Sequence, residues 1–167
     1  MSQKKNLPAA SYYYVLWGVI VALYSVAKYF VIEHGMKSLN SASILFLVGG
    51  VLSFLQARKN DEPASGIDKV YMKVWIGIAI GLFLVNTIGY KLGVGYIIAI
   101  TLSLYCIGSL ITGWLSKFTP SILGGVICAI CIALCFYVTY AQQFLILAIA
   151  VIAVHVYPGI VMSKSNK

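Results

Sequence analysis

The residues best suited to chemistry lie on two apolar segments in the second half of the chain. Five hydroxyl side chains recur on one of them at steps of three or four residues: Thr101, Tyr105, Ser109, Thr112 and Ser116. This spacing places them on one face of a helix. In lipid a polar face turns inward, where it either lines a path for a polar solute or joins helices through hydrogen bonds. The sequence leaves both interpretations open.

His155 is the ionisable residue that lies deepest within a predicted apolar helix. Ionisable groups inside a membrane are costly and commonly mark binding sites or proton paths. The alternative is a neutral histidine that bonds a hydroxyl group or the carbonyl left free by Pro158. The candidate polar path or pocket of this chain consists of Thr101, Tyr105, Ser109, Thr112, His155 and Tyr157.

Acidic residues are missing from the predicted membrane interior. The chain has four of them, all at helix ends or in a polar loop: Glu33, Asp61, Glu62 and Asp68. Proton-coupled transporters commonly use an embedded carboxylate, and metal-dependent hydrolysis needs a cluster of His, Asp or Glu. The two histidines lie far apart in the sequence. We therefore expect no metal, no cofactor and no enzymatic activity.

The four cysteines are a weaker candidate for chemistry. Cys128, Cys131 and Cys135 share one face of an apolar helix, and Cys106 lies in the preceding one. A reactive thiolate is disfavoured in such apolar surroundings. The sequence therefore predicts small packing residues and not a redox or metal site.

The composition indicates which solvent surrounds these helices. Hydrophobic residues make up 61% of the chain and charged residues 10%, with a mean hydropathy of +0.94. Soluble domains are about 45–50% apolar and about 25% charged. The chain is therefore predicted to be an integral membrane protein with the lipid bilayer as its main partner.

Six segments approach the length of about 20 residues that a membrane helix needs. They cover residues 12–32, 41–57, 70–89, 94–115, 119–140 and 144–162. The first follows Lys4 and Lys5 and is too long for a signal-peptide core, so we expect a membrane helix there. The second is short, and a re-entrant segment is its alternative. The fold class is all-α: one domain over residues 1–167, in a compact six-helix bundle.

Two features predict where the later helices turn or end. Gln142 and Gln143 interrupt the apolar sequence, so we expect a tight turn over residues 141–143. Pro158, followed by Gly159, lacks a backbone donor and is predicted to bend or end the sixth helix.

Basic residues are unevenly distributed between the two ends of such a bundle. The end that holds both termini carries nine of the twelve Lys and Arg residues: Lys4, Lys5, Arg58, Lys59, Lys69, Lys73, Lys117, Lys164 and Lys167. The other end carries Lys28, Lys37 and Lys91. The positive-inside rule then places both termini in the cytoplasm. Because the net charge of +8 is not gathered in one patch, we expect no nucleic-acid partner.

Aromatic and small residues complete the predicted architecture. Tyr14, Trp17 and Trp75 lie near the cytoplasmic ends of helices, where amphipathic rings favour the headgroup region. Small residues at steps of four allow helices to approach closely. The predicted helix-packing positions are Gly77, Gly81, Gly125 and Ala129.

Three functions are compatible with these features. The leading hypothesis is a non-enzymatic structural or accessory protein that contacts itself or a larger membrane complex through its helices. The alternative is a small homo-oligomeric transporter or channel for a neutral or weakly polar solute. An enzyme acting on a lipid or isoprenoid would need His155 or Tyr157 to work without an acidic or metal partner. Small size and short loops favour the bacterial inner (plasma) membrane.

Overall fold

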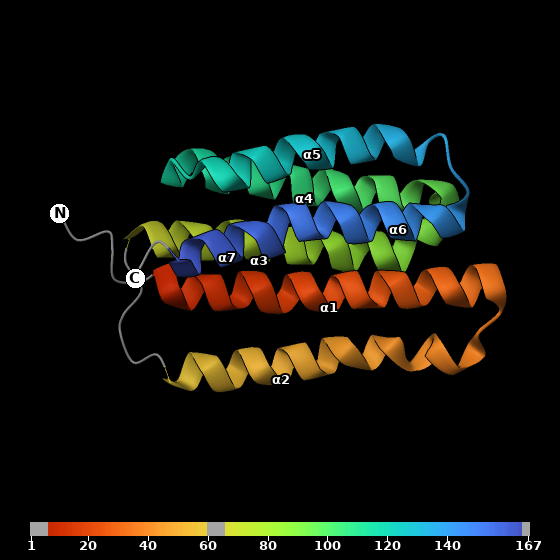
Figure 1. Cartoon of the computed structure of the whole chain (residues 1–167), viewed down its shortest axis with the longest axis horizontal. Helices are drawn as coiled ribbons and strands as arrows, with labels where there is room; N and C mark the ends of the chain where they lie inside the picture. Colours follow the sequence, from red (N-terminus) through yellow and green to blue (C-terminus); the bar gives the residue numbers. More distant parts are fainter. Residues whose placement is uncertain (1–6, 60–65, 165–167) are drawn as a thin grey trace.

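The computed structural model describes residues 7–59 and 66–164, which form helices and no strand. The helices α1 to α6 run back and forth along one axis, so that consecutive ones are antiparallel, and α7 continues α6 in the same direction through η3 (Figure 1). The beginning of α1 and the end of α7 lie at the same end of the bundle (Figure 1). The elements are α1 (Leu7–His34), η1 (Lys37–Ser43), α2 (Ile44–Lys59), α3 (Gly66–Ile88), η2 (Gly89–Leu92), α4 (Val94–Ser116), α5 (Thr119–Cys135), α6 (Tyr140–Val151), η3 (Ile152–Val156) and α7 (Tyr157–Lys164).

The lengths and compositions of these helices are compatible with a membrane protein. Four stretches are long and apolar enough to cross a bilayer: Ser11–His34, Lys37–Arg58, Val94–Ser116 and Tyr140–Lys164. Two shorter apolar helices, Met72–Ile88 and Thr119–Cys135, accompany them. The predicted all-α class is thus confirmed for the described residues, and six helices fit the arrangement.

The core lies where α4, α5, α6 and η3 meet α1. Gly125 lets α5 approach Leu110 of α4, because a Cβ there would lie only 2.7 Å from the Leu110 side chain. Two thiols bond across the same interface. Cys106 Sγ donates to the carbonyl of Gly125, and Cys128 Sγ donates to the carbonyl of Leu102, each at 3.3 Å. Here the cysteines act as small packing residues that also satisfy backbone groups.

The turn between α5 and α6 comes earlier than the polar Gln142–Gln143 pair suggested. The α5 helix ends at Cys135, and α6 begins at Tyr140. Thr139 caps α6: its hydroxyl accepts from the Gln142 backbone N–H at 3.3 Å, while the Gln142 side chain accepts from the Thr139 N–H at 3.1 Å. This capping box satisfies two backbone donors that a helix start leaves free. Gln142 therefore belongs to the first turn of α6.

Pro158 does not end the last helical stretch, which continues to Lys164. The five residues of η3 before it form a π-helical turn, in which the N–H of Tyr157 donates to the carbonyl of Ile152. A proline inside an α-helix clashes with the carbonyl four residues earlier. The wider π turn is one way in which a helix absorbs such a disruption and continues.

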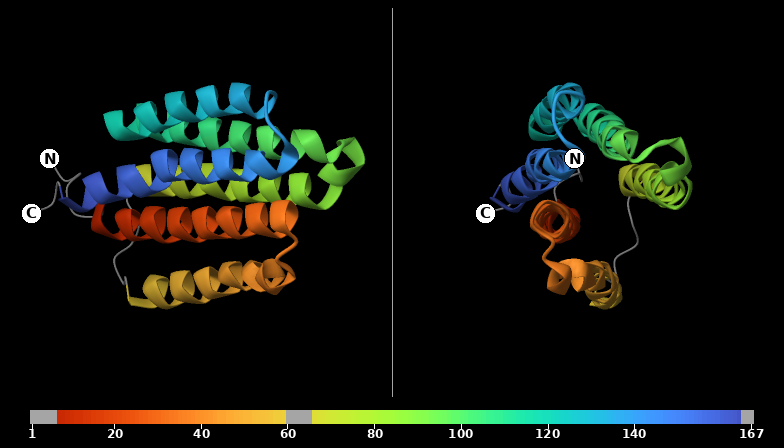
Figure 2. Two further views of the ribbon diagram at one scale, coloured as in Figure 1. Left: turned by 45° about the vertical axis from the view of Figure 1, so that its right-hand side comes forward. Right: turned by 90° about the vertical axis from the view of Figure 1, so that its right-hand side faces the viewer.

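Helices α2 and α3 lie at the edge of the bundle (Figure 2). Among the described elements, η1 and α2 pack against α1 and each other, and α3 packs against α4 and η2. Trp17 Nε1 donates to Ser53 Oγ at 3.1 Å and joins α1 to α2. Beside this bond, Gly49 lies against Ile20 and Trp17. Each edge helix is therefore held by one long neighbour.

Candidate functional site

His155 lies inside a group of three aromatic rings from three different helices. Its exposed fraction is 6%. The centroid of its ring lies 4.9 Å from that of Trp75 on α3, 5.2 Å from that of Tyr105 on α4 and 5.5 Å from that of Tyr14 on α1. The Trp75 and Tyr105 rings meet the imidazole edge to face, an arrangement that aromatic rings favour. We call these four residues the histidine cage.

Two glycines fix the π-helical turn that carries His155. On one side, a Cβ added at Gly18 of α1 would lie 2.8 Å from the Cβ of His155 and 2.7 Å from Val156. On the other side, a Cβ at Gly124 of α5 would overlap the carbonyl oxygen of Ala153. Both neighbours can approach this closely only because they lack a side chain. The position of the imidazole is therefore set by backbone packing on two sides.

Two polar atoms within the cage have no hydrogen-bond partner. They are Nε1 of Trp75 and Nδ1 of His155, both buried. Indole N–H can only donate, whereas a neutral imidazole nitrogen either donates or accepts. Buried polar atoms are normally paired, so such an exception calls for an explanation. Two of them in contacting rings mark this place as the best candidate site among the described residues.

The hydroxyl groups of Ser109 and Thr112 on α4 bond to nearby groups. Ser109 Oγ donates to the carbonyl of Ser121 on α5 at 2.7 Å. Thr112 Oγ1 donates to the carbonyl of Gly108 at 2.7 Å and accepts from the Tyr14 hydroxyl at 3.4 Å. Ser109 and Thr112 are fully buried, and Thr101 is 7% exposed. The hydroxyl face thus points inward, and these bonds join α4 to α1 and α5.

The remaining predicted positions are scattered over the bundle. Tyr157 is 49% exposed at the start of α7, outside the histidine cage. Gly81 lies against Leu104 of α4, with 3.2 Å to an added Cβ. A Cβ added at Gly77 would meet no neighbouring atom of the described residues within 4 Å, and Ala129 is exposed on α5. Gly125 packs against α4, as described above.

Tyr14 and Trp75 are site residues that the sequence assigned to a headgroup belt. Composition and position give the depth of a ring along a helix but not the side to which it points. Gly18 was the available signal for Tyr14, since a glycine one turn later on the same helix face marks a close contact with a neighbouring helix.

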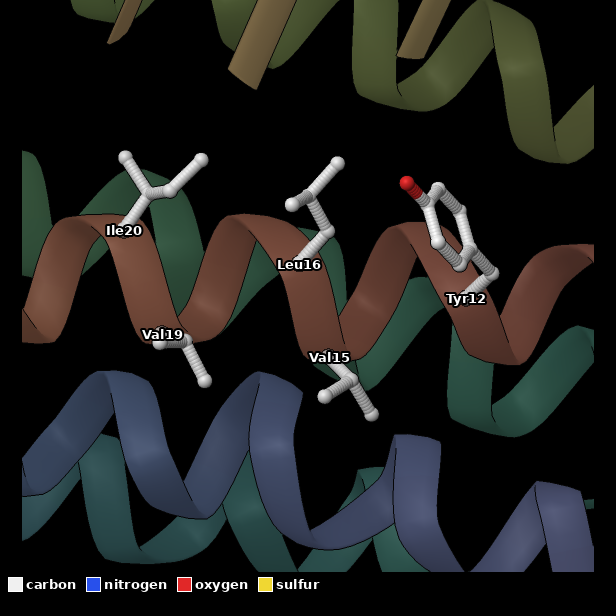
Figure 3. A pocket seen from close by; sticks show the side chains of 5 residues that line it. All are labelled: Tyr12, Val15, Leu16, Val19 and Ile20. Carbon is white, nitrogen blue, oxygen red and sulfur yellow. The ribbon is translucent and has the colours of Figure 1, made fainter. Parts of the chain in front are cut away.

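An apolar pocket of about 310 Å³ lies on the face of α1 that is opposite to Tyr14 and Gly18. Its lining residues are Tyr12, Val15, Leu16, Val19 and Ile20. Val15 and Val19 point to one side of the helix, and the other three point to the other side (Figure 3). Leu16 is two residues from both Tyr14 and Gly18, about 200° around the helix. The pocket is therefore separate from the histidine cage.

Comparisons with known proteins give no match. This holds for protein-family models, for curated proteins and for solved structures.

Proposed function

We propose that this chain is an integral membrane protein of a bacterial inner membrane, that it crosses the bilayer six times, and that both termini lie in the cytoplasm. The back-and-forth course of six apolar helices supports this topology (Figure 1). The α4–α5 junction, which contains Lys117, lies at the same end of the bundle as the start of α1 (Figure 1). The excess of basic residues at that end favours the cytoplasm.

Labelling of single cysteines tests this topology. We expect a membrane-impermeant maleimide to label Lys91→Cys in spheroplasts and to label Lys117→Cys only after the membrane is opened. The four native cysteines are buried, so their background labelling should be low. Labelling of Lys117→Cys in intact spheroplasts, with Lys91→Cys protected, would reverse the proposed orientation.

Within the membrane, the proposed activity is non-enzymatic and consists of helix–helix contacts with a second copy or with another membrane protein. The observation that carries this proposal is the outer face of α2, formed by Leu47, Gly50, Val51 and Phe54. These residues follow one another at steps of three, one and three, which places them on one side of a helix. Leu47, Val51 and Phe54 are 71%, 59% and 57% exposed, and a Cβ added at Gly50 would meet no atom of another described part of the chain within 4 Å. A small residue between large apolar ones is a common feature of helix contacts in membranes.

The bonding of the α4 hydroxyls also favours this proposal over a polar path. Ser109 and Thr112 both donate to backbone carbonyls. The Ser109 bond joins α4 to α5, the Thr112 bond lies within α4, and a hydroxyl that is bonded in either way is less available to a passing solute. The polar face of α4 therefore serves the cohesion of the bundle.

The second candidate function is a homo-oligomeric transporter or channel for a neutral or weakly polar solute. The unpaired nitrogens of Trp75 and His155 favour it. They provide a polar point inside an otherwise apolar bundle, which a solute could contact during passage.

Flux through liposomes separates the two candidates. For the leading function, we expect purified wild-type protein to show no saturable uptake of small neutral solutes above that of empty liposomes. For the second, uptake saturates and falls in the variants His155→Ala and Thr112→Ala while the protein stays folded. Saturable uptake by the wild-type protein alone would therefore contradict the leading function.

A further inference from the structure

The histidine cage is closed unevenly by its neighbours. In the described residues, the backbones of α1, α4 and α5 lie close to that of η3, whereas the backbone of α3 lies close to neither η3 nor α1. On the α3 side, the Trp75 indole reaches across to both Tyr14 and His155. Trp75 is only partly buried. On this side, the ring of Trp75 covers His155.

The free polar atoms of the cage are complementary to a group with both an acceptor and a donor. The Trp75 N–H can donate to an oxygen, and the unpaired Nδ1 of His155 can accept from an N–H or O–H. Amides and alcohols carry both functions close together. A ligand of this kind would form hydrogen bonds with two buried groups at once. Binding sites use such bonds to select their ligand, because a molecule that lacks the matching groups leaves the buried atoms unpaired.

The surroundings of the cage favour a neutral ligand. Its walls are aromatic rings, and the polar groups on its border are the hydroxyls of Tyr14, Tyr105 and Thr112. Among the described side chains, no ion pair and no acidic contact is formed at His155. An ion held there would be buried without a counter-charge, which is strongly unfavourable.

We propose that the histidine cage binds a small neutral molecule whose amide or hydroxyl group accepts a hydrogen bond from Trp75 Nε1 and donates one to His155 Nδ1. The site goes beyond the proposed helix–helix function, because binding requires neither a partner protein nor transport. If the histidine cage binds no ligand, the proposed contacts of α2 are unaffected. If α2 forms no contacts, the proposed ligand site is unaffected.

Three probes of the same shape test the proposal: acetamide, acetate and acetamidinium, which are neutral, anionic and cationic. Each is titrated into the full-length protein in lipid nanodiscs, and the indole N–H signals of ¹⁵N-labelled tryptophan are recorded by NMR. The signal of Trp75 is assigned with Trp75→Phe. We expect acetamide to shift it saturably, while the signals of Trp17 and Trp114 stay in place. A saturable shift with either ion, or none with acetamide, would overturn the proposal.

Two histidine variants form a matched pair. His155→Phe keeps a planar ring but removes Nδ1, and we expect it to raise the Kd for acetamide by about fivefold or more. His34→Phe, at the exposed end of α1, should leave the Kd unchanged. If His155→Phe disturbs the fold, as judged from the Trp17 and Trp114 signals, the wild-type protein with ¹⁵N-labelled histidine decides. The Nδ1 signal of His155 must then shift with the same Kd as the indole of Trp75, and a signal that does not move refutes the site.

Discussion

Replacing Gly124 with alanine should destabilise the bundle by about 2–3 kcal/mol, the upper part of the usual range for overpacking a tight interior. An added Cβ would overlap the carbonyl oxygen of Ala153 and lie 3.1 Å from the Cα of Val154. These are backbone atoms of the π-helical turn, so they cannot rotate away as the end of a flexible side chain can. Gly18 packs against the other side of the same turn, which leaves little room for a shift. Thermal unfolding in detergent, followed by circular dichroism, should show a midpoint lower by about 4–12 °C.

Gly50→Ala is the matched control for this prediction. The substitution is the same and also lies within a helix, but no neighbouring atom lies within 4 Å of the added Cβ. Alanine is favoured over glycine inside a helix by about 0.8–1 kcal/mol. We therefore expect the unfolding midpoint to stay constant or rise slightly. Equal losses of stability in the two variants would show that the contact with η3 is not what makes Gly124 necessary.

Gly50→Leu should abolish association of the protein with its partner while the monomer stays folded. Gly50 lies between Leu47 and Phe54 on the outer face of α2, in open space. A leucine there fits the isolated bundle, yet it separates α2 from any helix that packs closely against it. We expect the cross-linked or co-purified complex to fall at least tenfold, with an unchanged thermal midpoint for the monomer. Blue native electrophoresis after mild extraction measures the ratio.

Gly77→Leu on α3 is the control for this second prediction. A Cβ added at Gly77 would likewise meet nothing within 4 Å in the part of the chain that the structure describes, and Gly77 lies on the other edge helix. Its substitution adds the same side chain to a different outward-facing surface, and association should persist. Loss of association in Gly77→Leu together with its survival in Gly50→Leu would assign the contact surface to α3 instead.

The sequence predicted the helical class and the polar face of α4 because both depend on local periodicity. Hydroxyl groups at steps of three or four residues must share a side of their helix, and Ser109 and Thr112 are indeed buried. The thiol contacts of Cys106 and Cys128 are likewise consistent with the expected packing role. These features need no knowledge of which helices are neighbours.

Features that depend on neighbours could not be predicted in the same way. Tyr14 and Trp75 surround His155 because side chains of α1, α3 and η3 meet there. The sequence of one apolar helix does not indicate which helices pack against it. The edge position of α2 could not be predicted either, because the lipid-facing and protein-facing surfaces of a membrane helix are both apolar.

At two places the sequence contains a local signal, but the structure there differs from the prediction. Thr139 followed three residues later by Gln142 is the pattern of a capping box, and it gives the start of α6. Pro158 was expected to bend or end the helix, whereas the π-helical turn before it allows the helix to continue. In both places local hydrogen bonding outweighs the general preference of the residue.

Native mass spectrometry of the tagged protein, released gently from its own membrane, tests most directly whether it acts through helix contacts. The account predicts a defined complex in the wild-type protein, either a homo-oligomer or a stoichiometric assembly with another membrane protein, and a monomer in Gly50→Leu. A wild-type protein that is monomeric under these conditions, or a complex that survives in Gly50→Leu, would contradict the proposed role of α2.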